Sequence, residues 1–387
     1  MPLGAVHAAE PKHNTLTDKE LADGWILLFD GETLYGWKPN KEADWEVVDG
    51  TIRASKGKPT LLTSTSEYAN YELKVDFKAS PKTNSGVFLR VPQTGGDIEK
   101  NMYELNIAPA DNPYPTGSLV RRKRAAEVLP DDAWHTFDVT ADGGHVIVKL
   151  DGKQVLSYFD PIPAPAGRIA LQFNEGPIQF RSIKLRPLGT KSIFNGRDLA
   201  GWKVYPEAEK KKSVYSVTDN GELNVKNGPG SLESEGKYAD FLLQFEVFSN
   251  GKHLNSGVFF RSIPGEFTNG YECQIHNGYK DGDRTKPLDY GTGGFYRRQP
   301  ARLVNSDDFK WVPITLNVTG NHMAAWVNGV QVSDWTDTRK PDSNPRKGLR
   351  TEAGTLSIQG HDPTTDLSFR KLRIVEFPTL NGGKSAK

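Results

Sequence analysis

Apolar and polar residues alternate along most of this chain, with the two-residue period of a β-strand that is buried on one face. The pattern is clearest in residues 71–78, where apolar and charged residues take turns. In residues 146–150 it is followed by Asp151-Gly152, a pair typical of a tight hairpin turn. The alternation predicts strands over residues 71–78, 146–150, 169–171 and 180–185, the last with a local irregularity.

A seven-residue pattern occurs twice, 171 positions apart. It reads Asn-Ser-Gly-Val-Phe-x-Arg at 84–90 and again at 255–261. Other pairs return in the same order, among them Gly36-Trp37 and Gly201-Trp202, Tyr103-Glu104 and Tyr271-Glu272, Phe180-Arg181 and Phe369-Arg370. Repetition in a fixed order indicates duplication of one domain. We expect a leader at 1–16, copy one at 17–188, copy two at 189–378 and a tail at 379–387.

Both copies are predicted to be antiparallel β-sandwiches of the jelly-roll type. Copy two repeats the strand pattern over 241–248, 311–318, 324–327, 356–358 and 369–374. Many short strands separated by turns are typical of two stacked sheets. One short helix is expected after Thr17, because Thr17 and Glu20 can form a capping box. The linker near residue 188 is short, so we expect the copies to pack against each other.

Composition excludes several functional classes. A net charge of +1 over 387 residues gives no broad basic surface for nucleic acid, and the basic run at 121–124 stands alone. No stretch approaches the ~20 apolar residues of a membrane span. The single cysteine, Cys273, excludes an internal disulfide. Small residues near position 8 resemble the end of a signal peptide, so export to the periplasm or medium is expected.

Alternation also sorts the side chains of copy two into two faces. Glu272, Gln274 and His276 share a polar face, opposite an apolar face that includes Cys273. By the same rule, the residues of the 255–261 motif that share one face are Asn255, Gly257, Phe259 and Arg261. An aromatic ring, an arginine, amides and a carboxylate on one sheet surface would suit a sugar-binding groove. A structural alternative is a cross-strand ion pair between Arg261 and Glu272.

Comparison of the two copies separates candidate catalytic residues from shared ones. Glu272 and Gln359 have counterparts of the same type in copy one, Glu104 and Gln172. Three groups able to exchange protons do not: copy one has Ala108, Val120 and Asn174 where copy two has His276, Tyr296 and His361. Histidine titrates near neutral pH and often acts as a general acid or base. We therefore expect chemistry in copy two, and binding or scaffolding in copy one.

Other roles for these residues stay open. The histidines can instead hydrogen-bond sugar without catalysis. Glu272, His276 and His361 can also be read as two histidines and a carboxylate around a divalent metal. The segment 281–283 resembles part of a calcium loop but lacks its ligand spacing, which favours a solvated turn.

Together the motifs resemble the 3-keto-disaccharide hydrolase domain family. The resemblance rests on Phe-Asp/Asn-Gly followed by Gly-Trp, on Asn-Ser-Gly-Val-Phe-x-Arg, on Tyr-Glu-x-Gln-Ile, on the Asn328-Gly329 turn and on the final Phe-Arg-x-Leu-Arg-Ile. It covers nearly all of both copies, but copy one departs at the three positions named above. It implies a concanavalin A-like jelly roll and action on a glycoside oxidised at C3 of a sugar. We expect no cofactor. The substrate class implies an upstream reaction that forms the ketone, such as that of a sugar 3-dehydrogenase.

The chemistry implied by the resemblance is β-elimination. A 3-keto group acidifies the C2 hydrogen, and the glycosidic oxygen on C1 can then leave, with or without later addition of water. Our hypothesis makes His276 or His361 the base and Tyr296 or the other histidine the acid. Arg261 would stabilise the enolate and Glu272 would orient a histidine, while Asn255, Phe259, Gln274 and Gln359 bind substrate. The alternatives are a lectin-like binding protein and, less favoured, a two-carboxylate glycosidase.

Overall fold

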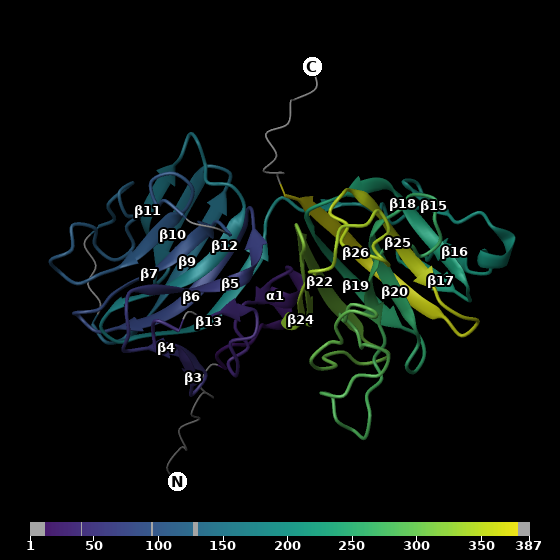
Figure 1. Ribbon diagram of the computed structural model, residues 1–387, viewed down its shortest axis with the longest axis horizontal. Coiled ribbons are helices and arrows are strands. Elements are labelled where there is room, and N and C mark those ends of the chain that lie inside the picture. Colours follow the sequence, from purple (N-terminus) through teal and green to yellow (C-terminus); the bar gives the residue numbers. More distant parts are fainter. Residues whose placement is uncertain (1–11, 40, 94–95, 127–130, 378–387) are drawn as a thin grey trace, which may run out of the picture.

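Two β-sandwiches lie side by side, one from each copy, with a short helix between them (Figure 1). The computed structural model describes residues 12–39, 41–93, 96–126 and 131–377. The leader prediction falls mostly on residues 1–11 and the tail prediction on 379–387, which lie outside the described residues. Nearly all regular structure is β, as predicted, and no described helix is long and apolar enough to cross a membrane.

Copy one is built from one sheet of eight strands and one of five. The larger sheet contains β1 (Ile26–Leu27), β3 (Glu46–Val48), β4 (Thr51–Ala54), β6 (Tyr71–Ala79), β9 (Trp134–Asp142), β10 (His145–Leu150), β11 (Lys153–Phe159) and β13 (Ile178–Pro187). Its order is β11-β10-β9-β6-β13-β4-β3, with β1 also paired to β13. The smaller sheet contains β2 (Trp37–Lys38), β5 (Thr60–Tyr68), β7 (Asn84–Val91), β8 (Tyr103–Ile107) and β12 (Gly167–Glu175). Its order is β2-β5-β12-β7-β8.

Copy two has the same arrangement. Its larger sheet contains β14 (Lys191–Ser192), β16 (Val214–Val217), β17 (Leu223–Lys226), β19 (Phe241–Ser249), β22 (Trp311–Thr319), β23 (His322–Val327), β24 (Val330–Thr336) and β26 (Asp366–Glu376). The order is β16-β17-β26-β19-β22-β23-β24, with β14 paired to β26. The smaller sheet contains β15 (Trp202–Val204), β18 (Gly230–Tyr238), β20 (Ser256–Ser262), β21 (Tyr271–Ile275) and β25 (Gly354–Gly360), in the order β15-β18-β25-β20-β21. One 3-10 turn, η1 (Ala208–Lys210), follows β15.

The predicted strands are confirmed in both copies, and each sandwich closes on its own apolar core. The irregularity expected in 180–185 is a register shift between Arg181 and Lys184, with Ser182 at a φ of 49°. The predicted helix is α1 (Asp18–Ala22), and its capping box joins Thr17 and Glu20. In each copy the five-stranded sheet turns one face to the core. We call its opposite face the outer face.

The copies pack against each other through the larger sheet of copy two. In β23 both faces are buried: Met323 and Ala325 belong to the core of copy two, whereas Ala324 and Trp326 belong to the apolar cluster of copy one. The indole of Trp326 donates to the Leu27 carbonyl at 2.8 Å. An apolar interface with satisfied backbone groups holds the two sandwiches in one relative position.

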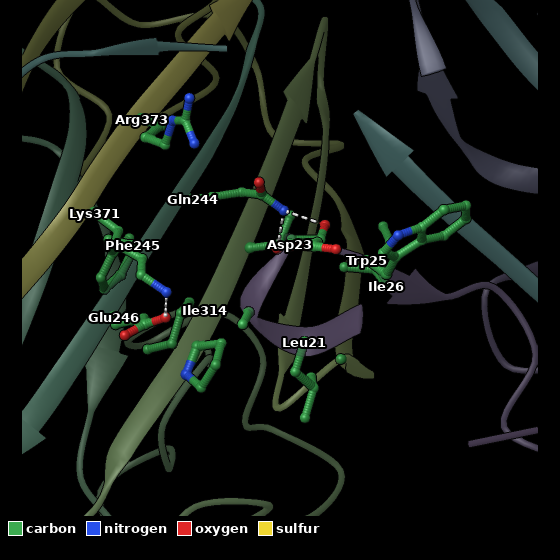
Figure 2. A pocket seen from close by; sticks show the side chains of 15 residues that line it. Leu21, Asp23, Trp25, Ile26, Gln244, Phe245, Glu246, Ile314, Lys371 and Arg373 are labelled. Atoms are coloured by element: carbon green, nitrogen blue, oxygen red, sulfur yellow. Dashed lines mark hydrogen bonds and ion pairs between the residues drawn. The ribbon is translucent and has the colours of Figure 1, made fainter. Parts of the chain in front are cut away.

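A small cavity remains where α1 meets the larger sheet of copy two (Figure 2). It measures about 50 Å³. Gln244 crosses it and donates to the Gly24 carbonyl at 2.8 Å, while Lys371 pairs with Glu246 at 2.7 Å (Figure 2). The polar groups that line this cavity are paired with protein partners, so we interpret the cavity as part of the packing between the copies.

Truncation of Trp326 to alanine is expected to destabilise the junction by about 3–5 kcal/mol. Trp326 is 1% exposed, and its removal leaves a cavity between the copies and an unpaired Leu27 carbonyl. Thermal unfolding followed by calorimetry should then show two separate transitions. The control is Phe309→Ala, which removes an exposed aromatic from copy two. Equal effects of the two variants would contradict an energetic role for this contact.

Candidate active site

Polar side chains of copy two gather on the outer face of its five-stranded sheet. Cα register places Phe259 opposite both Glu272 and Ser357, and Gly257 opposite Gln274. Neighbouring residues of the same strands, such as Val258 and Cys273, face the core. Period-two alternation therefore brings Glu272, Gln274 and Gln359 to one surface, as predicted.

Glu272 lies flat against the sheet on β21, the edge strand of the five-stranded sheet. A Cβ added at Gly257 would meet the Glu272 Oε1 at 2.7 Å, so the glycine leaves the space that the carboxyl occupies. Glu272 is only 6% exposed. Burial raises the pKa of Glu272 to about 7, although the guanidinium of Arg346 opposes the rise. A carboxyl that titrates near neutral pH can both accept and donate a proton.

Arg346 brings a cation to this face, and no pattern in the sequence predicted it. It belongs to the segment between β24 and β25. Its Nη2 donates to the Glu272 Oε2 at 3.2 Å, and its guanidinium lies 5.1 Å from the Phe259 ring centre. The ring of Phe259 is 1% exposed beneath this segment. The prediction that Phe259 offers its face to a sugar is therefore wrong, because Arg346 covers it.

Arg261 is a further correction. The residue is fully buried, and its side chain donates to the carbonyls of Ala239, Gly320 and Arg350 and to the Asp240 carboxylate. Its φ of 48° and the register shift between Phe259 and Ser262 mark a β-bulge. The bulge breaks the two-residue period, so Arg261 does not share the face of Glu272. With every donor group engaged, Arg261 neither pairs with Glu272 nor reaches a substrate.

Asp289 joins the predicted amides Asn255 and Gln274. Its Oδ2 accepts hydrogen bonds from the side-chain amides of both residues. Asp289 and Tyr290 are consecutive non-glycine residues with positive φ, 43° and 67°, a backbone geometry that persists only where the surroundings fix it. This carboxylate was not predicted, because it lies in the long connection between β21 and β22, where no periodicity identifies a face.

The two predicted histidines differ in their hydrogen bonds. Nδ1 of His276 accepts from the Gly278 backbone N–H at 3.2 Å, which assigns the proton of the neutral ring to Nε2. Burial lowers the pKa of His276, so the neutral form dominates near pH 7. His361 pairs through Nδ1 with Asp362 at 2.8 Å, its side chain is 43% exposed, and its Nε2 makes no hydrogen bond with the described residues. His276 thus presents a donor at Nε2, and the Asp362 carboxylate orients the ring of His361.

Tyr296 and Gln359 complete the face. The Tyr296 backbone N–H donates to the Glu272 carbonyl at 3.1 Å, and its half-buried ring lies 5.9 Å from the Arg346 guanidinium. The side-chain oxygens of Gln274 and Gln359 are buried and accept no hydrogen bond in the described part of the chain. Buried acceptors without partners are rare in folded proteins and suit the hydroxyl groups of a ligand.

A sequence profile describing the 3-keto-alpha-glucoside-1,2-lyase-like domain matches residues 24–186 and again residues 189–375. The chain belongs to this family. The resemblance drawn from the motifs is therefore confirmed.

The chain is also similar to one named relative and to two solved structures. The chain is 34% identical over 172 residues to a 3-keto-disaccharide hydrolase of Bacteroides thetaiotaomicron, with 35% of this chain and 59% of that protein covered. A Parabacteroides distasonis protein provisionally assigned to the glycosyl hydrolases shares 24% identity at a TM-score of 0.40, over 46% of this chain and all of its own. The carbohydrate-binding module CBM66 of Bacillus subtilis shares 14% identity at a TM-score of 0.32, over 38% of this chain and 94% of its own.

Copy one of this lyase-like pair retains a reduced version of the site. Glu104 occupies the place of Glu272, and burial raises its pKa, with a hydrogen bond from Gln172 opposing the rise. Asn106 donates to the Tyr114 carbonyl rather than to a carboxylate. Ala108 stands where copy two has His276, so copy one has no imidazole at this position.

Glu272, His276 and His361, considered above as metal ligands, do not form a metal-binding cluster. Among residues 12–39, 41–93, 96–126 and 131–377, no group of three histidine, cysteine or acidic side chains could hold an ion. Glu272 is instead paired with Arg346, and His361 with Asp362. The Asp283 carboxylate accepts a hydrogen bond from the Thr285 hydroxyl, two residues further on, as is common in a solvated turn.

Proposed function

We propose that copy two cleaves 3-keto-glycosides by proton abstraction at C2 and β-elimination of the C1 oxygen. The observation that carries this proposal is Glu272, a buried carboxyl whose pKa is raised to about 7, beside the guanidinium of Arg346. Such a pair supplies a base of useful strength at neutral pH and a cation for the developing enolate. The family and the Bacteroides relative support a 3-keto-glycoside as the substrate class.

The steps balance with the residues present. Glu272 takes the C2 proton, and the electron pair moves to the C3 oxygen, where Arg346 and the Nε2–H of His276 stabilise the charge. The C3 carbonyl then re-forms, a double bond forms between C1 and C2, and the C1–oxygen bond breaks. His361 gives a proton to the departing oxygen. Its exposed position at the rim suits a leaving group that exits to solvent.

This assignment moves the base from histidine to Glu272. His276 holds its proton on Nε2, so that atom is a donor rather than an acceptor. Arg346 takes the role first given to Arg261. Tyr296, Gln274 and Gln359 would contact substrate hydroxyls, and water can add to the unsaturated product to give net hydrolysis.

The direct test is incubation of the full chain with a panel of 3-keto-glucosides. Release of the aglycone together with transient absorbance of an unsaturated ketone supports elimination. The non-oxidised glucosides serve as controls, because without the ketone the C2 hydrogen is not acidic. Saturable binding of 3-keto-glucosides without any turnover would instead favour the lectin-like alternative.

The rate should depend on pH through Glu272. As only the carboxylate accepts a proton, kcat/KM is expected to fall about tenfold per unit as pH drops below about 7. Arg346→Gln removes a charge that lowers the pKa of Glu272, so the acid limb should move to higher pH. Asp289→Asn removes a charge that raises it, so the limb should move to lower pH. Profiles that coincide in both variants would contradict Glu272 as the base.

We also expect the protein to be exported and its substrate to be formed by a separate sugar-oxidising enzyme. Export is supported only by the small residues near position 8, and a sugar-oxidising dehydrogenase is supported by the need for a ketone at C3. Detection of the mature protein outside the cytoplasm, and co-purification of 3-keto-sugar formation with a dehydrogenase, would test the two ideas separately.

A further inference from the structure

A groove lies on the outer face of copy one. It has a volume of about 550 Å³ and is lined by Lys38, Pro39, Lys41, Leu61, Thr63, Val91, Pro92, Gln93 and Arg168. These residues come from β2, β5, β12 and β7 and from the loops that follow β2 and β7. At a strand spacing of about 4.8 Å, a groove that crosses four strands extends for about 14 Å. This length suits an extended chain better than a single small molecule.

Arg168 is the unusual residue of this groove. Its side chain is only 8% exposed, yet its Nε is buried without a hydrogen-bond partner among the described residues. The Glu67 carboxylate lies 4.0 Å from this Nε, at the limit of an ion pair. A guanidinium has five N–H donors in a planar fork, and a buried donor without an acceptor is costly. Nε is the buried donor here, so an acceptor in the groove would contact the Nη groups at the end of the side chain.

The same position in copy two is built differently. Pairing of equivalent strands places Arg168 where copy two has Thr355, and Thr63 where copy two has Glu233. In copy two the pair is satisfied internally, because the Thr355 hydroxyl donates to Glu233. Copy one has exchanged a threonine for a cation and a carboxylate for a threonine. Directly opposite Arg168, copy one has Glu67 where copy two has Lys237, so copy one carries the cation on β12 and copy two carries it on β18.

We propose that this groove of copy one binds an acidic polysaccharide, with Arg168 gripping a carboxylate of a uronic acid residue. The planar fork of arginine matches a carboxylate through two parallel hydrogen bonds. Lys38 and Lys41 are exposed along the same groove and add attraction for further carboxylates of the chain.

The floor of the groove favours sugar over nucleic acid. Beside Arg168 lies a separate apolar cluster on the outer face that contains Phe88, Val91 and Ala170, with Leu61 packed against it. Of this cluster, Val91 and Leu61 line the groove and can pack against the apolar face of a sugar ring. None of the residues lining the groove is aromatic, whereas single-stranded nucleic acid is held mainly by stacking on aromatic rings.

The experiment is calorimetric titration of the full chain with galacturonic acid oligomers at low salt. We expect saturable binding that neutral galactose oligomers do not show. Arg168→Gln should weaken it at least tenfold, and joint replacement of Lys38 and Lys41 by glutamine about threefold. Glu67→Gln should strengthen it, because the competing carboxylate is removed. Arg197→Gln, which removes an exposed charge from copy two, is the matched control and should leave binding unchanged.

Unfolding separates recognition from a structural role. Arg168→Gln removes the cation opposite Glu67, so the free variant is compared with itself: its melting temperature should not rise when the oligomer is added, whereas that of the parent protein should. The Glu272→Gln variant should bind the oligomer as the parent protein does, so a failure of the catalytic proposal leaves this test intact.

Equal binding of neutral oligomers, or unchanged affinity in Arg168→Gln, would overturn the proposal. So would preference for single-stranded nucleic acid. A sulfated glycan without uronic acid that binds equally well to the parent protein and to Arg168→Gln would also overturn it.

Discussion

Replacement of Glu272 by glutamine is expected to lower kcat/KM on a 3-keto-glycoside by roughly 10²–10⁴-fold, the usual contribution of a general base. Glutamine keeps the shape of the carboxyl but cannot take the C2 proton. The fold should tolerate the change, because a pKa of about 7 means that the site already accommodates the neutral acid. Initial rates of aglycone release and thermal unfolding measure the two effects independently.

Hydrogen exchange at C2 distinguishes a base from a group that only binds. In D₂O the parent protein should incorporate deuterium at C2 of recovered substrate. Glu272→Gln should lose this exchange, whereas His361→Asn should retain it and lose aglycone release. Glu104→Gln is the matched control, since Glu104 holds the equivalent position in copy one. Undiminished exchange in Glu272→Gln would assign the base to another residue.

Strands and faces were predictable wherever the chain keeps its two-residue period. The alternation in 71–78 and 271–275 correctly separated the residues that face the core from those that face away from it, because successive side chains of a pleated strand point to opposite faces. The match between copies predicted the position of Glu272 and its neighbours from sequence alone. The prediction failed at Arg261 because a bulge inserts one residue into the count.

Arg346 and Asp289 escaped prediction because loops carry no period. A signal was nevertheless present in the lengths of the two copies. Copy one passes from Phe159 to Gly167 between its equivalent strands, whereas copy two passes from Thr336 to Gly354 and places Arg346 in the added residues. Insertions present in only one of two duplicated domains are therefore good places to look for residues that act in that copy alone.

The pairing of acids and bases also could not be read from residue type. Arg261 and Arg346 have the same side chain. Arg261 donates all its hydrogen bonds to three carbonyls and Asp240, whereas Arg346 lies over the candidate site. The repeated motif drew attention to Arg261 because its role is shared by both copies. In copy one, Arg90 donates to the carbonyls of Ala69, Gly143 and Ala164 in the same manner. The arginine is therefore repeated in both copies because each fold needs it to bind these carbonyls.

Replacement of Arg261 by methionine is accordingly expected to destabilise copy two by about 3–5 kcal/mol, as when one partner of a buried ion pair is removed. The methionine fills part of the volume but leaves three carbonyls and Asp240 without their donor. For a domain of this size the loss corresponds to a fall in melting temperature of roughly 6–20 °C. Calorimetry of the full chain measures the change.

The matched replacement in copy one is Arg90→Met, which breaks the same set of carbonyl contacts at the equivalent bulge. It should destabilise copy one to a similar degree. Because Arg261 contacts only protein groups, Arg261→Met should retain kcat and KM at temperatures where the native circular dichroism persists. A large loss of kcat in a variant that remains fully folded would return Arg261 to the catalytic machinery and contradict its structural assignment.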